Sequence, residues 1–377
     1  MKITIVSGFF LPVPTVAGGA MEKIWHRMAR EFAAAGHEVT YCSRRWPGFA
    51  DEEDMEGFHM IRLPGFTHTR SLPRNLLLDF IWGTRVYRRL PPADIVVLNT
   101  VILPAWLPRL KPAAGRVVAV LGRMPKGQCR FYGGVTRVVA TSEAVRTQVR
   151  RENPRLDERT RVVPNPIDWD LHQRDRRQSS PLTIGYVGRI NPEKGLELLL
   201  GAAALLARRA DLPDWRLRLV GPQTVAEGGG GEAYVGSLRA LAAGAGDRIT
   251  FSSPIYDPAV LADAYASFDV FCYPSLAAKG EGLSVAPIEA MAAGAVPVVS
   301  ALECYDDVIR SGTNGLVFDH QAANRVEQLA DALAGLLTDG ERRRRLAVQA
   351  RQDARAFDYG VVARSFLDDF AALTAGR

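Results

Sequence analysis

Two glutamates that lie eight residues apart, Glu281 and Glu289, have the types and spacing that most suggest chemistry in this chain. Between them, Ser284 suits a helix N-cap, and Pro287 is tolerated because first-turn amides have no intrahelical partner. We therefore expect Glu281 in a loop and Glu289 inside a short helix. The free amides at such a helix start suit a sugar or phosphate oxygen. Carboxylates placed this way could bind the hydroxyls of a sugar and a ribose, although an ordinary loop and helix with two solvated glutamates would look the same.

A second segment, residues 188–195 (Gly-Arg-Ile-Asn-Pro-Glu-Lys-Gly), directly follows a predicted strand. Asn191 suits a helix N-cap and Pro192 suits the first helical position, so we predict that a helix starts here. Arg189 would then lie on the entering loop and Lys194 in the first turn. Two cations at a helix start can hold a diphosphate without a metal. A plain surface turn is the alternative, because the segment is neither a Walker loop nor a GxGxxG motif.

The composition is that of an ordinary globular protein, with 377 residues, 47% hydrophobic and 23% charged, which predicts two or three domains. Four cysteines without a CxxC pair and six histidines without ligand spacing argue against disulfides or zinc and favour a reducing cytoplasm. The Asp168-Trp-Asp170 pattern precedes a linker, and we expect no metal there. Pro12 and Pro14 interrupt the apolar N-terminus, so we predict a first strand and loop there rather than a signal peptide. No run reaches the ~18 apolar residues of a membrane span.

Positive charge is concentrated in the first half of the chain. Residues 1–180 hold 28 Lys/Arg and 17 Asp/Glu, a charge of +11, whereas residues 181–377 hold 19 and 24, a charge of −5. This asymmetry suggests an anionic ligand or a membrane surface, although an arginine-rich proteome would give the same excess. Nucleic acid is poorly supported, because the arginines are scattered rather than clustered with aromatic residues. Residues 75–89 form a basic amphipathic helix candidate, either facing a membrane surface or facing the core. We expect a cytoplasmic protein, and the sequence leaves open whether it is peripheral to the inner membrane face.

Short β-branched runs alternate with helical patterns, which predicts two α/β domains with parallel sheets and a cleft between them. The predicted strands are residues 3–6, 39–42, 95–98, 117–120, 138–141, 182–187, 217–220, 249–251, 270–273 and 296–300. Long helices are predicted over 22–32 and 196–210. The polar, aperiodic segment 169–181 reads as a linker, and Gly228–Gly231 as a flexible surface loop.

The motifs together resemble the family 4 retaining glycosyltransferases of the GT-B fold. The resemblance is carried by residues 188–195, Pro274-Ser275, residues 281–289, Gly18-Gly19 with Glu22, residues 36–39, 163–168 and 312–316, and Phe357-Asp-Tyr with Phe366 and Phe370. It implies two Rossmann-like domains that face each other across a cleft. The N-terminal, acceptor-binding domain would span residues 1–175 and the C-terminal, donor-binding domain 176–355. A C-terminal helix over 356–377 would pack back on the first domain.

The resemblance also implies an activity. The chain would be a retaining, metal-independent hexosyltransferase that moves a sugar from a UDP- or GDP-linked donor to an acceptor hydroxyl. No cofactor is expected, and the acceptor would be a saccharide or a lipid-linked saccharide in cell-surface polysaccharide or glycolipid biosynthesis. Two alternatives remain open: a non-catalytic paralogue that acts as a binding subunit, and a sugar-nucleotide epimerase on the same fold.

The resemblance implies the following residue roles. The catalytic group would be Arg189 and Lys194, which hold the donor diphosphate, together with Glu281 on the donor sugar. The donor would further contact Glu289 through its ribose, the backbone of Gly188, Gly282, Leu283 and Ser284, the closely approaching Gly18 and Gly19, and Ile255 near the base. Asn99 stands where the family often has a histidine and would contact the acceptor. Arg123 and Lys126 lie where first-domain loops would face the cleft, and they would contact an anionic acceptor or be solvated surface charges.

Overall fold

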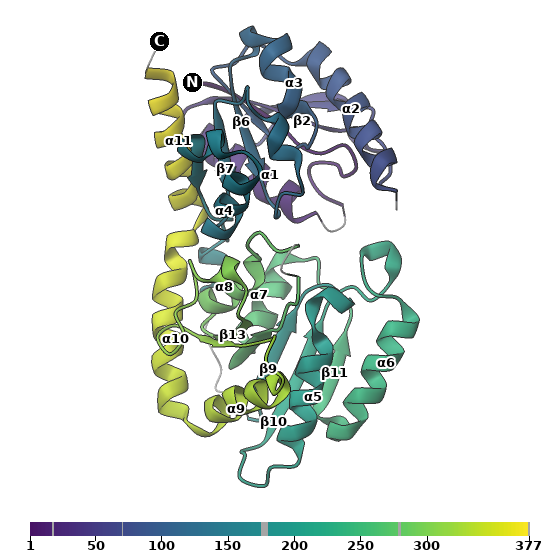
Figure 1. Cartoon of the computed structure of the whole chain (residues 1–377), viewed down its shortest axis with the longest axis vertical. Helices are drawn as coiled ribbons and strands as arrows, with labels where there is room; N and C mark the ends of the chain where they lie inside the picture. The colour runs from purple at the N-terminus through teal and green to yellow at the C-terminus, as the bar shows by residue number, and fades with distance from the viewer. Residues whose placement is uncertain (17–18, 70, 175–179, 278–279, 376–377) are drawn as a thin grey trace. The chain divides into compact units, whose positions relative to one another are not determined.

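The computed structural model describes residues 1–16, 19–69, 71–174, 180–277 and 280–375, and it divides the chain into two compact units. Unit 1 comprises Met1–Pro166 and Tyr359–Arg377, and unit 2 comprises Ile167–Asp358 (Figure 1). The unit borders therefore lie nine residues before and three residues after the expected ones at 175 and 355. Among the described residues, no helix combines the length and apolar character that a membrane crossing requires.

Unit 1 is built on an eight-stranded sheet with the order β3-β4-β2-β1-β5-β6-β7-β8. All neighbours are parallel except β3 and β4, and Ile3 of β1 pairs with Val39 on one side and Ile95 on the other. The strands are β1 (Lys2–Val6), β2 (Glu38–Arg44), β3 (Glu52–Met55), β4 (Phe58–Leu63), β5 (Ile95–Leu98), β6 (Arg116–Leu121), β7 (Arg137–Ala140) and β8 (Thr160–Val162). The helices are α1 (Ala20–Ala34), α2 (Leu72–Arg89), α3 (Leu103–Leu110) and α4 (Glu143–Glu152). The central strands are buried β-branched runs, as expected of a parallel sheet covered on both faces.

Unit 2 contains a wholly parallel six-stranded sheet with the order β11-β10-β9-β12-β13-β14. The strands are β9 (Leu182–Val187), β10 (Trp215–Val220), β11 (Ile249–Ser252), β12 (Val270–Tyr273), β13 (Val296–Ser300) and β14 (Leu316–Phe318). The helices are α5 (Leu196–Ala207), α6 (Glu232–Ala242), α7 (Pro258–Ala266), α8 (Val285–Ala292), α9 (Arg325–Thr338) and α10 (Gly340–Ala354) (Figure 1). The predicted α/β class and every predicted strand are confirmed, whereas the helix predicted over 196–210 ends at Ala207.

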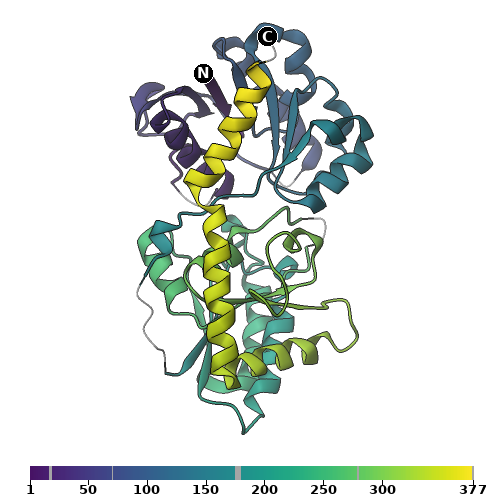
Figure 2. The same ribbon diagram turned by 90° about the vertical axis from the view of Figure 1, so that its left-hand side faces the viewer.

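The last helix, α11 (Tyr359–Ala375), belongs to unit 1 and lies along it (Figure 2). Its Phe366 ring is 5.3 Å from the Trp25 ring of α1, and its Phe370 ring is 5.8 Å from that of Phe32. Asp369 is buried in the same interface and accepts two hydrogen bonds from Arg137, at 2.9 and 2.8 Å. Aromatic packing and this ion pair therefore join the end of the chain to the start of unit 1.

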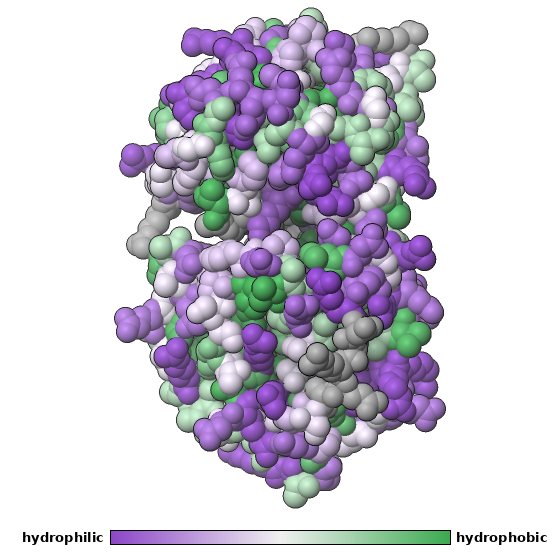
Figure 3. Space-filling model, turned by 180° about the vertical axis from the view of Figure 1, so that it is seen from behind, coloured by the Kyte–Doolittle hydropathy of each residue, from purple (hydrophilic) through white to green (hydrophobic). Residues whose placement is uncertain are grey.

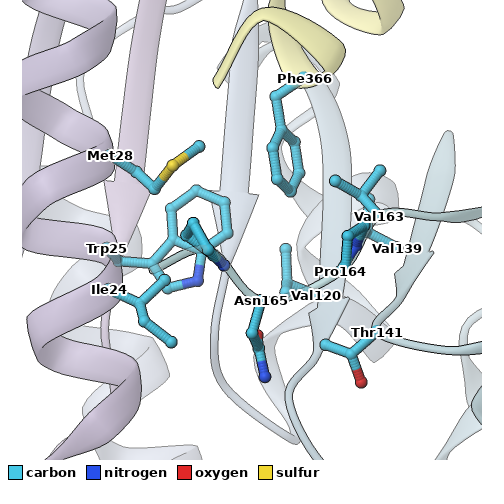
Figure 4. A pocket seen from close by; sticks show the side chains of 11 residues that line it. Ile24, Trp25, Met28, Val120, Val139, Thr141, Val163, Pro164, Asn165 and Phe366 are labelled. Carbon is cyan, nitrogen blue, oxygen red and sulfur yellow. The ribbon is translucent and has the colours of Figure 1, made fainter. Parts of the chain in front are cut away.

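A small gap remains where α11 covers the sheet of unit 1 (Figure 4). Apolar side chains line it, among them Ile24 and Met28 of α1 and Phe366 of α11, with Asn165 at one side. Its volume is about 10 Å³, roughly the space that one water molecule requires. We therefore regard it as a packing gap and not as a ligand site.

The segment predicted as a linker over 169–181 is ordered in its first part, which corrects that interpretation. Residues 170–172 form a 3₁₀ turn, and Asp168 accepts a hydrogen bond from the Leu171 amide at 3.1 Å. His172 is buried, and its ring packs edge-on against Tyr265 of α7, with centroids 5.5 Å apart. The sequence did not indicate this packing, because only one side chain of the turn enters the core and the segment shows no apolar periodicity. Residues 175–179 lie outside the described residues.

The glycine run over 228–231 also differs from the expected free loop. The Gly230 amide donates to the carbonyl of Ile190 at 2.8 Å, and the Asn191 side chain donates to the carbonyl of Gly228 at 3.2 Å. The run therefore packs against the loop that follows β9.

The surfaces of both units are mostly hydrophilic on the face drawn in Figure 3, with hydrophobic residues in separate small groups.

Candidate functional site

The loops that follow β9 and β12 meet at the carboxyl edge of the unit 2 sheet, where such sheets commonly bind ligands. The Leu276 amide donates to the Glu193 carbonyl at 2.8 Å and joins the two loops. Gly195 lies at φ 63°, and a Cβ there would lie 2.2 Å from the Pro274 carbonyl oxygen. Only glycine allows this approach, so the glycine at position 195 determines how closely the two loops pack.

Lys194 and Glu281 form a buried ion pair where these loops meet. The two residues are 6% and 8% exposed, and Ser275 Oγ donates to the same Glu281 oxygen at 3.0 Å. Lys194 Nζ also lies 5.1 Å from the centre of the Tyr273 ring. Burial alone would lower the pKa of Lys194, but Tyr273 and Glu281 outweigh it and hold the pKa above its usual value. A fixed positive charge and a carboxylate are thus placed side by side at the strand ends.

The predicted helix start at Pro192 is wrong in detail. Residues 192–194 form a single 3₁₀ turn, and α5 begins only at Leu196, because the positive φ of Gly195 interrupts the helix. Asn191 precedes the turn, but its side chain makes no capping bond and donates to the Gly228 carbonyl instead. Lys194 consequently points to Glu281 rather than projecting from a first helical turn.

Arg189 follows Gly188, next to β9, and is more exposed than Lys194. Its guanidinium lies 3.6 Å from the Glu193 carboxylate, and its carbonyl accepts a hydrogen bond from Tyr186 Oη at 2.8 Å. The backbone of Arg189 is therefore held, while its side chain remains accessible to solvent. The two predicted cations differ in character, one buried and paired and one at the surface.

Glu289 lies within α8, as its spacing predicted, and its Oε2 accepts a hydrogen bond from Tyr265 Oη at 2.8 Å. Burial lowers the pKa of His172, and the nearby carboxylates of Glu289 and Asp168 oppose the shift. Ser284 occupies the N-cap position of α8 but makes no capping bond, which corrects that expectation. Its hydroxyl donates instead to Tyr273 Oη at 3.1 Å.

Three further donor residues that the sequence predicted lie on loops of the same unit. Gly282 and Leu283 are buried between Glu281 and α8, and Ile255 is half-buried on the loop after β11. Sequence reasoning missed Tyr273 and Tyr265, which hold Ser284 and Glu289. Tyr273 had a readable signal, because a polar aromatic ends a predicted strand directly before Pro274. Tyr265 had none, because it lies inside α7, far from any motif.

The predicted acceptor residues follow the carboxyl ends of unit 1 strands. Asn99 comes directly after β5, and both polar atoms of its side chain are buried without a partner among the described residues. Arg123 and Lys126 are exposed on the loop after β6. Burial raises the pKa of Glu22, and its own backbone amide and Arg123 partly offset the shift. Gly19 lies at φ 77° before α1, and Gly18 is outside the described residues.

Two protein-family models match this chain. "Glycosyltransferase Family 4" matches residues 17–171, and "Glycosyl transferases group 1" matches residues 168–353. The two matches together extend over both units.

Curated proteins with similar sequences include spore coat protein SA of Bacillus subtilis (strain 168). It is 26% identical over 393 residues, which cover 97% of this chain and 98% of that protein. The D-inositol 3-phosphate glycosyltransferase of Rhodococcus opacus (strain B4) is 30% identical over 259 residues, covering 64% of this chain and 56% of that protein.

Solved structures show the same architecture. Sucrose-phosphate synthase from Thermosynechococcus elongatus superimposes with a TM-score of 0.79 at 21% identity, covering all of both chains. Anabaena Alr3699/HepE, solved in complex with UDP and glucose, gives a TM-score of 0.70 at 19% identity, covering 99% of this chain and 100% of that one. Two parallel-sheet units, glycosyltransferase family models over both, and these neighbours agree: the chain belongs to the family 4 glycosyltransferases of the GT-B fold.

Proposed function

We propose that this glycosyltransferase transfers a sugar from a nucleotide-sugar to an acceptor hydroxyl with retention of the anomeric configuration. The observation that carries the proposal is the buried Lys194–Glu281 pair at the carboxyl edge of the unit 2 sheet. The solved neighbour Alr3699/HepE, which was crystallised with UDP and glucose, supports a donor of this kind.

The two cations have different tasks in this proposal. Lys194 is fixed beside Glu281 and supplies a permanent charge toward the donor diphosphate, while the exposed Arg189 closes on the diphosphate when the donor binds. Both would stabilise the charge that develops on the departing nucleoside diphosphate. Because two cations already neutralise that charge, we propose that the reaction needs no metal.

The carboxylates would orient the donor. One oxygen of Glu281 already accepts bonds from Lys194 and Ser275, so the group is suited to hold a sugar hydroxyl rather than to attack as a nucleophile. Glu289, held by Tyr265, would accept hydrogen bonds from the ribose. Without a covalent nucleophile, retention follows if the acceptor attacks the face that the diphosphate leaves and passes its proton to a diphosphate oxygen.

The acceptor would be bound by unit 1. The two unpartnered amide atoms of Asn99 can each hydrogen-bond a saccharide hydroxyl, and the exposed Arg123 and Lys126 suit an anionic group such as a lipid pyrophosphate. A lipid-linked saccharide for a surface polysaccharide or glycolipid fits these contacts.

The function can be tested with the purified protein and a panel of UDP- and GDP-sugars. We expect one donor to bind in calorimetry and to be hydrolysed slowly without acceptor, with unchanged rates in EDTA. Lys194→Ala and Arg189→Ala should each lower this hydrolysis by 10²-fold or more, as for removal of a charge that stabilises a transition state. Arg216→Ala, which removes an exposed arginine of β10, is the matched control.

Other outcomes would contradict the proposal. Nucleotide binding without turnover on any donor would indicate a non-catalytic paralogue. Conversion of the nucleotide-sugar into an isomer, with no free sugar released, would indicate an epimerase. Near-native rates in both cation variants would place the chemistry elsewhere.

A further inference from the structure

We propose that the outward face of α2 docks on lipid bilayers that contain anionic lipids. The face, called the α2 outer face, consists of Arg74, Leu77, Phe80, Ile81 and Arg88. The inference does not depend on the donor chemistry, because it concerns a surface of unit 1. Figure 1 shows α2 as an outer helix of that unit.

The helix has two apolar sides, of which only one is used by the core. Trp82, Gly83 and Val86 are buried against the sheet. Leu77 and Phe80, roughly on the opposite side, are 57% and 46% exposed. Large apolar side chains that remain exposed in neighbouring turns of one helix mark an interaction surface. The sequence left open whether this helix faces the core or a membrane, and the structure places apolar residues on both sides.

The charges on α2 are arranged for an anionic surface. The helix contains one acidic residue, Asp79, which is 4% exposed, so its solvent side carries no carboxylate. Arg74 and Arg88 are exposed and have no ion-pair or hydrogen-bond partner among the described residues. Arg85 and Arg89, by contrast, contact Phe66 and Glu52 of the same unit. The free arginines thus flank the exposed apolar residues, the arrangement of a helix that lies in a membrane interface.

A second helix supports the exposed aromatic residue. The Phe80 ring lies 6.1 Å from that of Trp106 in α3, and Tyr87 packs on the same indole at 5.7 Å. The adjacent end of α3 exposes Leu110, whose carbonyl accepts a hydrogen bond from Tyr87 Oη at 3.4 Å. Phe80 is therefore held in its outward position, which lowers the entropy lost when it enters a bilayer.

The same helix is tied to the segment that holds Asn99. Asp79 Oδ2 accepts hydrogen bonds from the amides of Val101 and Ile102, at 3.0 and 2.7 Å. The chain also enters α2 from the carboxyl end of β4, the sheet edge at which Asn99 lies. A bilayer on the α2 outer face would therefore lie near the residues proposed to bind the acceptor.

A bilayer fits this face better than another protein copy does. Unit 1 contains 27 Lys/Arg and 16 Asp/Glu, a charge of +11, so two such faces would repel each other. Anionic lipid satisfies both features at once, because its headgroups attract the arginines while the acyl boundary takes up Leu77 and Phe80.

The test is co-sedimentation of the full chain with vesicles of phosphatidylcholine alone or with 30% phosphatidylglycerol. We expect binding only to the anionic vesicles, weakening as salt is raised. Each arginine near an anionic surface contributes about fivefold, so Arg74→Ser/Arg88→Ser should lower the partition constant by roughly 10- to 30-fold. Leu77→Ser/Phe80→Ser should lower it by about tenfold or more while leaving the salt dependence in place.

Matched controls test whether vesicle binding depends on the α2 outer face or only on the total number of exposed arginines and apolar residues. Arg344→Ser/Arg345→Ser removes two exposed arginines of α10, and Leu241→Ser/Val260→Ser removes two exposed apolar residues of unit 2. Both controls should bind vesicles like the wild type, and all variants should retain its melting temperature. Equal loss in face and control variants, or no binding of the wild type to anionic vesicles, would overturn the proposal. Concentration-dependent dimerisation that the face variants abolish would assign the face to a second copy instead.

Discussion

At the scale of single residues, the Lys194–Glu281 pair is the contact on which the donor site depends. Removing one partner of a buried pair leaves the other charged and unpaired, which typically costs about 3–5 kcal/mol, whereas removing both can be nearly neutral. We therefore expect Lys194→Met to destabilise the protein by about 3 kcal/mol in urea unfolding. Lys194→Met/Glu281→Gln should recover most of that loss, because the neutral amide can still accept the bond from Ser275.

Activity separates the chemical role of the pair from its structural role. The double variant should remain inactive although it is stable, because the cation is gone. Since the folded pKa of Lys194 is raised, its contribution to stability is complete below the unfolded value near 10.4 and declines only above it. The stability difference between wild type and double variant should then be constant from pH 6 to 9. A double variant with native turnover would show that the cation has no catalytic role.

Tyr265 yields a second prediction at this scale. Tyr265→Phe removes only the hydroxyl that donates to Glu289, so Glu289 loses its fixed orientation. One hydrogen bond contributes about 0.5–1.5 kcal/mol, so the dissociation constant for UDP should rise about two- to thirteenfold. Tyr305→Phe is the matched control, because Tyr305 is fully buried and its hydroxyl has no partner among the described residues. Calorimetric titration with UDP measures both; equal affinities would show that the ribose is bound without Glu289.

At the scale of elements, Asp79 joins α2 to the start of α3. Burial raises its pKa to about 6, partly offset by the amides of Ile102 and Val101. The folded state therefore binds this proton more tightly than the unfolded chain, in which the pKa is near 3.9. The stability contributed by Asp79 is complete below about pH 4 and is lost as the pH rises through about 6.

Asp79→Asn should remove this pH dependence. An Asn oxygen can still accept an amide hydrogen bond, so the variant should fold, and its unfolding free energy should change less than that of the wild type between pH 4 and 6.5. The difference is at most about 3 kcal/mol for a shift of this size. Asp257→Asn is the control for exchanging a capping carboxylate, because Asp257 accepts bonds from the Ala259 and Val260 amides on the surface. Parallel pH profiles for wild type and Asp79→Asn would contradict the argument.

The elements also show what sequence reasoning can reach. Buried parallel strands that are nearly continuous β-branched runs, such as Val117–Val120, were predicted, because burial on both faces permits few other residue types. The parallel strand β4 was missed, because His59 and Arg62 interrupt its apolar pattern. The residues that predict where a helix begins were less reliable than the strand patterns. Asn191 and Ser284 both occupy N-cap positions, yet neither side chain caps its helix. Asn191 donates a hydrogen bond to the Gly228 carbonyl instead, and Ser284 donates one to Tyr273 Oη. Tertiary contacts decide such details, and a single sequence does not record them.

At the scale of the whole molecule, the family and the fold were predicted from combined motifs, whereas the unit border was displaced. The segment 169–174 is mostly polar, but one buried residue, His172, attaches it to unit 2. The supports of the site were missed for a similar reason. Tyr265 reaches Glu289 from 24 residues away, a pairing that no local spacing predicts.

Two units with separate cores and separate sheets should respond separately to perturbation. If the donor binds unit 2 alone, UDP at 100 times its dissociation constant should stabilise that unit by about 2.7 kcal/mol. Differential scanning calorimetry should then resolve two transitions, of which UDP raises only one. Ending the chain at Asp358 removes Phe366, Phe370 and Asp369 and exposes Trp25 and Phe32, so it should lower only the other transition. Asp369→Asn, which retains the aromatic contacts, should lower the same transition by less. If UDP and the truncation shifted the same transition, the donor and α11 would belong to one cooperative unit, and the assignment of the donor to unit 2 alone would fail.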